Sequence, residues 1–130
     1  MKRVMVFGMG PIGSVAARKL DDEPSISEII CADRNQKALD SIVGKLKKAK
    51  AVLLDAHDPE GIIRTAEGVD LILNALPLEC TKNVLDAALA VKADYQDYAG
   101  ATDLDTVWEE SELFDPESEP RFRDYLTLSW

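Results

Sequence analysis

The stretch that decides the fold of this chain is Lys2-Arg3-Val4-Met5-Val6-Phe7-Gly8-Met9-Gly10-Pro11-Ile12-Gly13. An apolar run of strand length leads directly into the pattern G-x-G-x-x-G, and a helix-forming segment follows at once. Pro11 suits the first turn of that helix, because the backbone N–H that proline lacks would have no partner there. The stretch therefore predicts a strand, a tight glycine turn and a helix in direct succession.

Each glycine of this pattern has its own physical reason. Gly8 permits a tight turn out of the strand, and Gly10, which has no Cβ, lets a pyrophosphate approach the backbone closely. Gly13 lets the helix lie near the strand, and Ala17 one turn later keeps that contact face small. The free N–H groups and the positive dipole end of the helix then favour an anion. The predicted phosphate loop consists of Gly8, Met9, Gly10, Pro11, Ile12 and Gly13.

An acidic residue further along the chain narrows the class of ligand. A second apolar run, Ile29-Ile30-Cys31-Ala32, ends in Asp33, twenty residues after Gly13. In dinucleotide-binding domains an acid at about this distance accepts hydrogen bonds from the adenosine ribose hydroxyls. A glycine-rich turn alone would also fit an ordinary loop, but here strand, glycines, helix, strand and acid occur in the expected order. We therefore predict a dinucleotide-binding domain.

Strand and helix patterns alternate along the first hundred residues. The periodicity predicts strands at 3–7, 28–32, 51–54, 70–74 and 95–98, and helices at 11–21, 35–46, 58–67 and 79–92. Near-continuous apolar strands separated by helices indicate a parallel sheet with helices on both faces. Right-handed crossovers favour the doubly wound order 3-2-1-4-5. The predicted fold class is α/β, of the Rossmann type.

The helices carry signals of their own starts and faces. Asp58 and Pro59 suit the cap and the first position of the third helix, and Gly68 is a plausible stop for it. On the first helix, the residues expected to form the apolar side are Ile12, Val15, Ala16 and Leu20.

The composition changes after the predicted sheet. Residues 103–130 hold nine acidic residues and two arginines, together with several aromatic residues. The segment from Asp103 to Phe114 has the spacing of an amphipathic helix. We expect residues 1–102 to form the dinucleotide-binding domain, and residues 103–130 to begin a connection to a substrate domain that this sequence does not contain.

Charge and hydropathy exclude several classes of function. The chain of 130 residues has a formal net charge of −9, and residues 51–130 carry five basic and eighteen acidic residues. Such an acidic half disfavours nucleic acid as a partner. No apolar run approaches the roughly 20 residues of a membrane span, and the run after Met1 is too short for a secretion signal. We expect a cytoplasmic protein, with a homo-oligomer left open.

Few side chains are candidates for metal binding or for nucleophilic catalysis. One histidine, His57, and two distant cysteines do not make a metal site, and no Ser-His-Asp arrangement is visible. Cys31 and Cys80 do not indicate a disulfide framework. Cys80 lies at the start of a predicted helix, where a thiolate would be favoured, but we expect both cysteines simply to pack. The sequence predicts no catalytic residue.

Four further motifs point to one family. Ala32-Asp33-Arg34-Asn35 ends the second strand, and Asp55-Ala56-His57-Asp58-Pro59 follows the third. Asn74-Ala75-Leu76-Pro77 ends the fourth strand, and Tyr95-Gln96-Asp97 follows with the fifth. With the glycine loop, these motifs resemble the N-terminal domain of the saccharopine dehydrogenase family, also called lysine–ketoglutarate reductase-like. The resemblance covers about residues 2–100 and does not extend to residues 103–130.

This resemblance implies where a dinucleotide would lie. Asp33 would bind the adenosine ribose, and Arg34, followed by Asn35, would stack on adenine or reach a 2′-phosphate. Asp55 and Ala56 would lie beside the adenine ring. The residues expected along the nicotinamide-side ribose are Asn74, Ala75, Leu76 and Pro77, although Asn74 and Pro77 also fit a plain strand-to-helix turn. The residues expected at the substrate end of the cleft are Asp97 and Tyr98.

The resemblance also implies the chemistry. A carboxylate at Asp33 would repel a 2′-phosphate and so favours NAD, whereas Arg34 would pair with that phosphate and keeps NADP open. The implied function is an oxidoreductase acting on an amino acid or related amine, inactive without its substrate domain. Two alternatives are a non-catalytic nucleotide-sensing domain, as in potassium-transport regulators, and an S-adenosylmethionine-dependent methyltransferase. The N-A-L-P and Y-x-D motifs argue against the first, and Gly13 with the small residues after it argues against the second.

Overall fold

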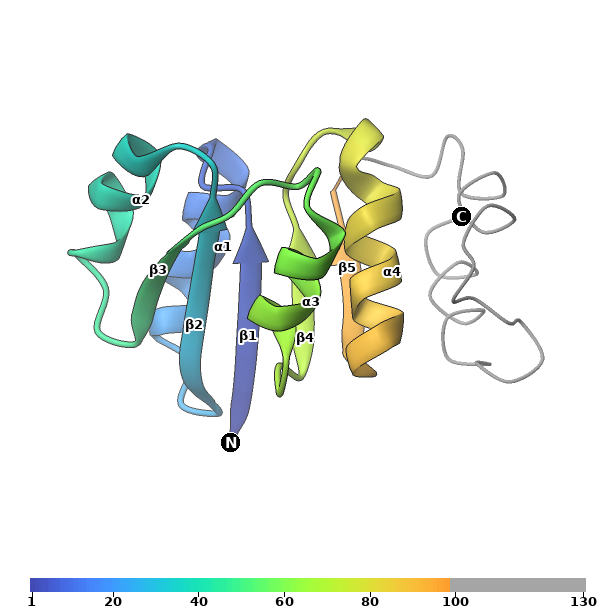
Figure 1. Ribbon diagram of the computed structural model, residues 1–130. Coiled ribbons are helices and arrows are strands. Elements are labelled where there is room, and N and C mark those ends of the chain that lie inside the picture. The colour runs from blue at the N-terminus through green and yellow to red at the C-terminus, as the bar shows by residue number, and fades with distance from the viewer. Residues whose placement is uncertain (99–130) are drawn as a thin grey trace.

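Five parallel strands form the centre of the protein in a computed structural model that describes residues 1–98 (Figure 1). In chain order the elements are β1 (Lys2–Phe7), α1 (Pro11–Asp21), β2 (Ile26–Asp33), α2 (Gln36–Val43), β3 (Ala49–Leu53), α3 (Pro59–Ala66), β4 (Leu71–Asn74), the short 3-10 helix η1 (Leu78–Cys80), α4 (Thr81–Val91) and β5 (Asp94–Asp97). The strand order is β3-β2-β1-β4-β5, and every neighbouring pair is parallel. The predicted α/β class and doubly wound order are confirmed. The helix expected from Asp103 to Phe114 lies outside the described residues.

The helices form a layer on each face of the sheet. In Figure 1, α3 and α4 lie in front of the strands and α1 and α2 lie behind them. Successive side chains of β1 point to opposite faces, so that Val4 and Val6 pack in the core behind the sheet while Met5 and Phe7 pack in front. All four are at most 1% exposed. The strands are therefore apolar on both faces because both faces are covered.

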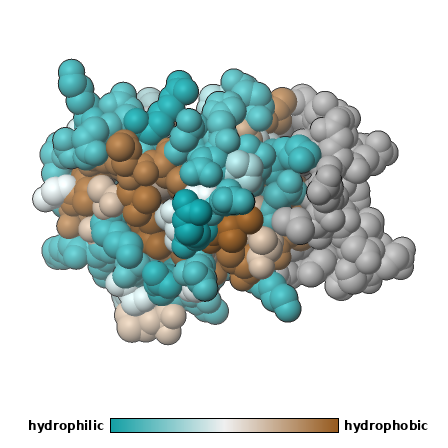
Figure 2. All heavy atoms as spheres, viewed as in Figure 1, coloured by the Kyte–Doolittle hydropathy of each residue, from teal (hydrophilic) through white to brown (hydrophobic). Residues whose placement is uncertain are grey.

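The helices cover the sheet less completely at its β3 edge. On the face shown in Figure 2, apolar side chains are visible over β2 and β3. A hollow of about 350 Å³ lies there between β3 and α3, with Ile30 and Val52 among its lining residues. Leu53 on β3 is 60% exposed. Within residues 1–98, β3 is an edge strand and only partly fits the expectation of a sheet covered on both faces.

The expected apolar side of α1 is wrong at two positions. Ile12 and Val15 are 53% and 49% exposed, and the buried residues of α1 are Gly13, Ala17 and Asp21. The helix comes so close to the sheet that its smallest side chains form the contact. Larger apolar residues are turned outward or to the flank, where Ala16 and Leu20 pack at the margin of the core.

Element boundaries differ from the predictions where local caps decide them. Asn35 is the N-cap of α2, because its side-chain oxygen accepts hydrogen bonds from the N–H groups of Lys37 and Ala38. The helix ends at Val43, three residues earlier than expected. The helix predicted from residue 79 begins instead as η1 and becomes α4 only at Thr81.

The third helix follows its sequence signals. The Asp58 carboxylate accepts a hydrogen bond from the N–H of Gly61 at 3.1 Å, and Pro59 is the first helical residue. The helix ends at Ala66, and Gly68 turns the chain with a φ of +78°. No helix within residues 1–98 combines the length and apolar character needed to cross a membrane.

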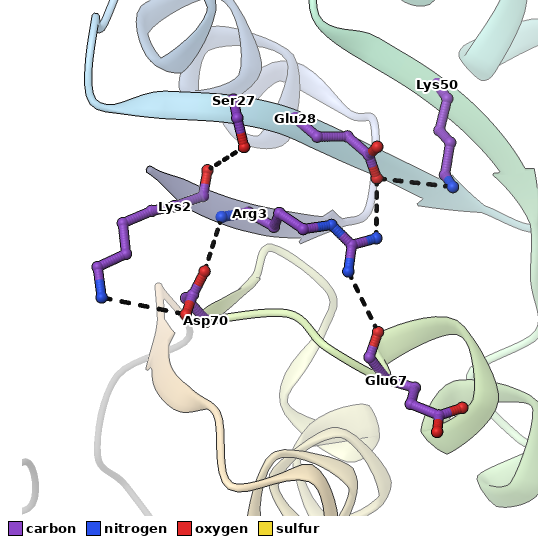
Figure 3. Close-up of polar contacts among 7 residues, drawn as sticks. All are labelled: Lys2, Arg3, Ser27, Glu28, Lys50, Glu67 and Asp70. Atoms are coloured by element: carbon purple, nitrogen blue, oxygen red, sulfur yellow. Dashed lines mark hydrogen bonds and ion pairs between the residues drawn. The ribbon is translucent and has the colours of Figure 1, made fainter.

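Polar contacts tie four segments together near the start of β1 (Figure 3). The backbone N–H of Arg3 donates to Asp70 at 2.8 Å, and its guanidinium donates to the Glu28 carboxylate on β2 at 3.0 Å. The same guanidinium reaches the backbone carbonyl of Glu67 at 3.4 Å. Lys50 on β3 lies 3.5 Å from the Glu28 carboxylate. Glu28 is therefore the shared acceptor of two cations from two other strands.

We predict that Glu28→Gln lowers the free energy of unfolding by about 1 kcal/mol at pH 7, because the partly exposed pair loses its charge. The hydrogen bond from Arg3 lowers the pKa of the Glu28 carboxyl below its ordinary 4.5. The contribution is therefore complete above pH 4.5 and is lost as the pH falls through the lowered pKa. Urea denaturation of both proteins at several pH values measures this difference.

Glu67→Gln is the matched control. Arg3 contacts the backbone carbonyl of Glu67, and Figure 3 shows the Glu67 carboxylate pointing away from it. The control should therefore change stability little. A Glu28→Gln effect that stays the same from pH 7 to pH 3 would contradict the assigned role of the charge.

Candidate functional site

The loops that follow β1 and β4 meet at the carboxyl edge of the sheet. From β1 the chain crosses to α1 behind the sheet, and from β4 it crosses to α4 in front of it (Figure 1). The N–H of Ala75 donates to the carbonyl of Phe7 at 2.8 Å, which joins the two loops directly. Open α/β sheets bind ligands in the crevice at such a change of direction. The structure thus brings the glycine loop and the 74–77 turn to one place.

Two glycines of the loop are required by the protein itself. Gly8 has a φ of +101°, and a Cβ there would lie 3.0 Å from the carbonyl oxygen of Ala75. A Cβ on Gly13 would overlap the carbonyl oxygen of Gly8. The turn and the close approach of α1 therefore leave no room for side chains at these positions.

Gly10 is different, because no contact within residues 1–98 requires a glycine there. Its φ of −74° is open to any residue, and a Cβ there would meet no atom within 4 Å. It is the N-cap of α1 and makes no side-chain cap, so the first N–H groups of the helix, including those of Ile12 and Gly13, lack acceptors within the helix. Gly10, Pro11 and Ile12 are exposed. The open space beside these N–H groups fits an anionic group that approaches the backbone.

The Asp33 carboxylate is held across the loop. One of its oxygens accepts the N–H of Met9 at 2.6 Å, and the other accepts the N–H of Asn35 at 2.8 Å. The side chain is only partly buried, so it remains open to a ligand at the end of β2. Sequence reasoning treated Asp33 only as a ligand contact. The structure adds that this carboxylate also ties the glycine loop to β2.

The residues expected beside adenine follow β2 and β3 in the chain. Two of them, Asp55 and Ala56, already form hydrogen bonds within the protein. Asp55 accepts the backbone N–H of His57 at 2.9 Å, and its carboxylate lies 3.0 Å from the His57 ring. These contacts, the backbone one first, lower the pKa of Asp55. Ala56 is buried, and its carbonyl accepts a hydrogen bond from Asn83 of α4 at 2.9 Å. Sequence reasoning missed Asn83, since no local pattern links residues so far apart in the chain.

The motifs at the ends of β4 and β5 are joined by a buried tyrosine. Asn74 is 1% exposed, and its side-chain oxygen accepts the N–H of Leu76 at 3.0 Å. Its side-chain nitrogen donates to the hydroxyl of Tyr95 at 3.1 Å, and that hydroxyl donates to Asp97 at 2.9 Å. Pro77 is exposed, and so is Tyr98. Asn74 thus shapes the turn, as the plain-turn interpretation expects. It is also connected to Asp97 through Tyr95, which the motif contained but to which no role in the site was assigned.

The cysteines behave as packing residues. Burial raises the pKa of the Cys31 thiol to about 11. Burial, followed by the charge of Glu79, also raises the pKa of the half-buried Cys80 thiol. For Cys80, burial thus outweighs the helix start, in agreement with the expectation that both cysteines pack. In the described part of the chain, no three His, Cys, Asp or Glu side chains gather in an arrangement that could hold a metal ion.

Comparison with known proteins decides the family. The family model described as the saccharopine dehydrogenase NADP binding domain matches residues 4–123. The chain belongs to this family. The resemblance predicted from the motifs is confirmed, and so is its general consequence, an NAD(P)-binding Rossmann domain.

One curated relative shows how much of a longer protein this family domain represents. Carboxyaminopropylagmatine dehydrogenase of Synechocystis is 33% identical over 104 residues, which cover 76% of this chain and 26% of the relative. The chain therefore spans about a quarter of the length of that dehydrogenase.

Solved structures support the fold of the family domain. Saccharopine dehydrogenase (L-Glu forming) from Saccharomyces cerevisiae matches with a TM-score of 0.66 and 20% identity, over 75% of this chain and 21% of that one. The dTDP-glucose 4,6-dehydratase DesIV from Streptomyces venezuelae, solved with NAD bound, matches with a TM-score of 0.58 and 22% identity, over 70% of this chain and 37% of that one. At such identities the likeness concerns the fold alone.

Alanine substitutions at Gly10 and Gly13, the two glycines at the ends of the first turn of α1, should differ in their effect on stability. Gly13 is tightly packed, whereas Gly10 faces open space. We predict that Gly13→Ala lowers the free energy of unfolding by about 3 kcal/mol or more, because the new Cβ overlaps the Gly8 carbonyl. Gly10→Ala should cost about 1 kcal/mol or less, as alanine is only a poorer N-cap. Chemical denaturation of both variants measures this. Equal losses would contradict the assignment of Gly10 to open space.

Proposed function

We propose that this domain holds NAD(H) in an oxidoreductase that acts on an amino acid or a related amine. The observation that carries the proposal is the open space over Gly10 among the described residues. It lies beside N–H groups that lack acceptors within the helix, in a domain of an NAD(P)-binding family. Two of the proteins it resembles are named as dehydrogenases of carboxyaminopropylagmatine and of saccharopine. We propose further that residues outside the described domain provide the substrate site and complete catalysis.

The proposed binding mode follows the order of the loops along the sheet edge. The pyrophosphate would lie on residues 8–13, where the positive end of α1 and its free N–H groups favour negative charge. Asp33 would accept hydrogen bonds from the adenosine ribose hydroxyls, since both of its oxygens are already oriented by backbone N–H groups. The residues proposed around the adenine are Arg34, Asn35, Asp55 and Ala56.

The other half of the dinucleotide would lie on the far side of the glycine loop. The proposed residues along the nicotinamide ribose are Asn74, Ala75, Leu76 and Pro77, and those toward the substrate are Asp97 and Tyr98. When bound, NAD(H) supplies the hydride transfer, and the protein contributes binding, orientation and electrostatics. In this domain the oriented groups are the helix N–H groups, the Asp33 carboxylate and the turn that Asn74 shapes.

Electrostatics at the end of β2 favours NAD over NADP in this proposal. A 2′-phosphate would stand where the Asp33 carboxylate faces the ribose, and like charges repel. Arg34, the next residue in the chain, carries a compensating charge. It lies close enough to Asp55 to help lower the pKa of that carboxyl, so part of its charge is already balanced. The net field at the ribose therefore disfavours the additional phosphate.

Titration of the purified chain with NADH, NADPH and S-adenosylmethionine tests the function. We expect NADH to bind more tightly than NADPH and S-adenosylmethionine not to bind, as followed by nicotinamide fluorescence and calorimetry. Addition of lysine, 2-oxoglutarate or saccharopine should give no turnover. Binding of S-adenosylmethionine alone would contradict the oxidoreductase proposal. Turnover would contradict the proposal that residues outside this domain are needed for catalysis.

Asp33 variants test the cofactor preference. Asp33→Ala should weaken NADH binding by about 1–3 kcal/mol, because a charged acceptor of hydrogen bonds is lost. NADPH should lose less or gain, since the repulsion of its phosphate is also removed. Asp33→Asn keeps an oxygen that can accept the N–H of Met9 and removes the charge, so it should shift the preference toward NADPH with less damage to the loop. Unchanged affinity for both cofactors in both variants would show that Asp33 does not contact the ribose.

A further inference from the structure

A directional chain of hydrogen bonds runs through the side chain of Tyr95. The N–H of Leu76 donates to the Asn74 side-chain oxygen at 3.0 Å, and the Asn74 nitrogen donates to the Tyr95 oxygen at 3.1 Å. The Tyr95 hydroxyl then donates to the Oδ2 atom of Asp97 at 2.9 Å. This series of hydrogen bonds begins at the 74–77 turn and ends on a carboxylate of β5. All of its bonds point the same way, so they reinforce one another.

The hydroxyl at the centre of this chain is not needed to fill the core. Tyr95 is 6% exposed and packs with residues of α4 such as Val84 and Leu85, where a phenylalanine ring would pack equally well. Strand pairing already places Asn74 opposite Asp97 in the register of β4 and β5. A buried hydroxyl costs free energy unless it is hydrogen-bonded. The buried Thr81 of α4 also lies beside this hydroxyl, and its other two polar neighbours, Asn74 and Asp97, belong to the candidate site, which gives the hydroxyl a role there.

The hydroxyl stays a donor over the whole physiological range of pH. Burial, followed by the charge of Asp97, raises the pKa of the Tyr95 phenol well above its ordinary value of 10. The phenol therefore keeps the proton that it donates to Asp97, while its oxygen accepts from Asn74. The hydrogen bonds from Leu76 to Asp97 therefore keep one direction.

The same contact determines which oxygen of Asp97 is available. Oδ2 accepts the Tyr95 hydroxyl, and within residues 1–98 no hydrogen bond is formed to Oδ1. Asp97 is only partly buried, and a carboxylate oxygen without a partner can accept a further hydrogen bond. The groups that suit it are hydroxyl and carboxamide N–H donors, both of which the nicotinamide riboside half of NAD carries.

We propose that Tyr95 is a positioning residue for the nicotinamide half of the dinucleotide. It acts through two residues, holding Asn74 so that the 74–77 turn keeps its shape and holding Asp97 so that Oδ1 faces the cleft. This proposal rests on the proposed function, because it assigns the nicotinamide half to this end of the site.

Tyr95→Phe in the full chain tests the proposal, with NADH and ADP as probes. ADP lacks the nicotinamide riboside, so its affinity should stay within about twofold, whereas NADH should bind about tenfold more weakly, or about 1.4 kcal/mol. Asp97→Ala should have a similar effect. The double variant should lose little more than either single one, because both remove the same interaction. Equal losses for NADH and ADP, or no loss for NADH, would overturn the proposal.

A readout without nucleotide separates this proposal from the proposed function. Amide hydrogen exchange of Leu76 in the free protein should be faster in Tyr95→Phe, because Asn74 loses the partner that orients it. Glu28→Gln, which also weakens the fold but lies at the other end of the sheet, should change neither Leu76 exchange nor the ratio of NADH to ADP affinity. Unchanged Leu76 exchange in Tyr95→Phe would overturn the proposed effect on the turn. If the unmodified chain bound neither NADH nor ADP, the proposed function itself would fail, and the nucleotide part of this proposal with it.

Discussion

The close approach of α1 to the loop after β1 is the constraint on which the rest of the structure depends. It requires glycine at position 13, where a Cβ would overlap the Gly8 carbonyl, and it makes Ala17 the next contact. Because the helix is held this close, its N-terminus lies where the loops that follow β1 and β4 meet. The same approach turns Ile12 and Val15 outward. A single steric requirement thus sets the packing of the helix and the position of its free N–H groups.

The carboxyl edge is organised by side chains that serve the fold and the site together. The Asp33 carboxylate holds the N–H of Met9 and so fixes the glycine loop against β2. Asn74 closes the turn that touches that loop, and Tyr95 connects Asn74 to Asp97. The two ends of the candidate site are therefore each supported by an oriented acid. Such support keeps polar groups in place before any ligand arrives.

The predictions succeeded where the deciding physics is local. Gly8, Gly10 and Gly13, the cap of Asp58 on α3 and the apolar strands all act within a few residues, so the element order and the sheet topology followed from them. The buried side of α1 was wrong at Ile12 and Val15 because hydrophobic periodicity cannot indicate how closely a helix will approach its neighbour. Cys80 packs as expected, because burial outweighs the effect of the helix start on its thiol. Asn83 was missed because the carbonyl it contacts lies 27 residues away in the chain. Tyr95 was recognised only as part of a motif, because its contact with Asn74, 21 residues away, appears only in the folded sheet.

The sequence by itself determined the α/β class, the order of the elements, the family and the positions of the glycine loop and of Asp33. These follow from backbone conformation, hydrophobic periodicity and short motifs, all of which are properties of neighbouring residues. Gly10 and Gly13 look alike in the motif. Only the tertiary structure decided that Gly10 faces open space, whereas at Gly13 neighbouring atoms occupy the place of a side chain. It alone also showed the link from Asn74 through Tyr95 to Asp97. The physical reason is that hydrogen bonds and steric overlap between separate strands depend on their register, which appears only when the sheet has formed.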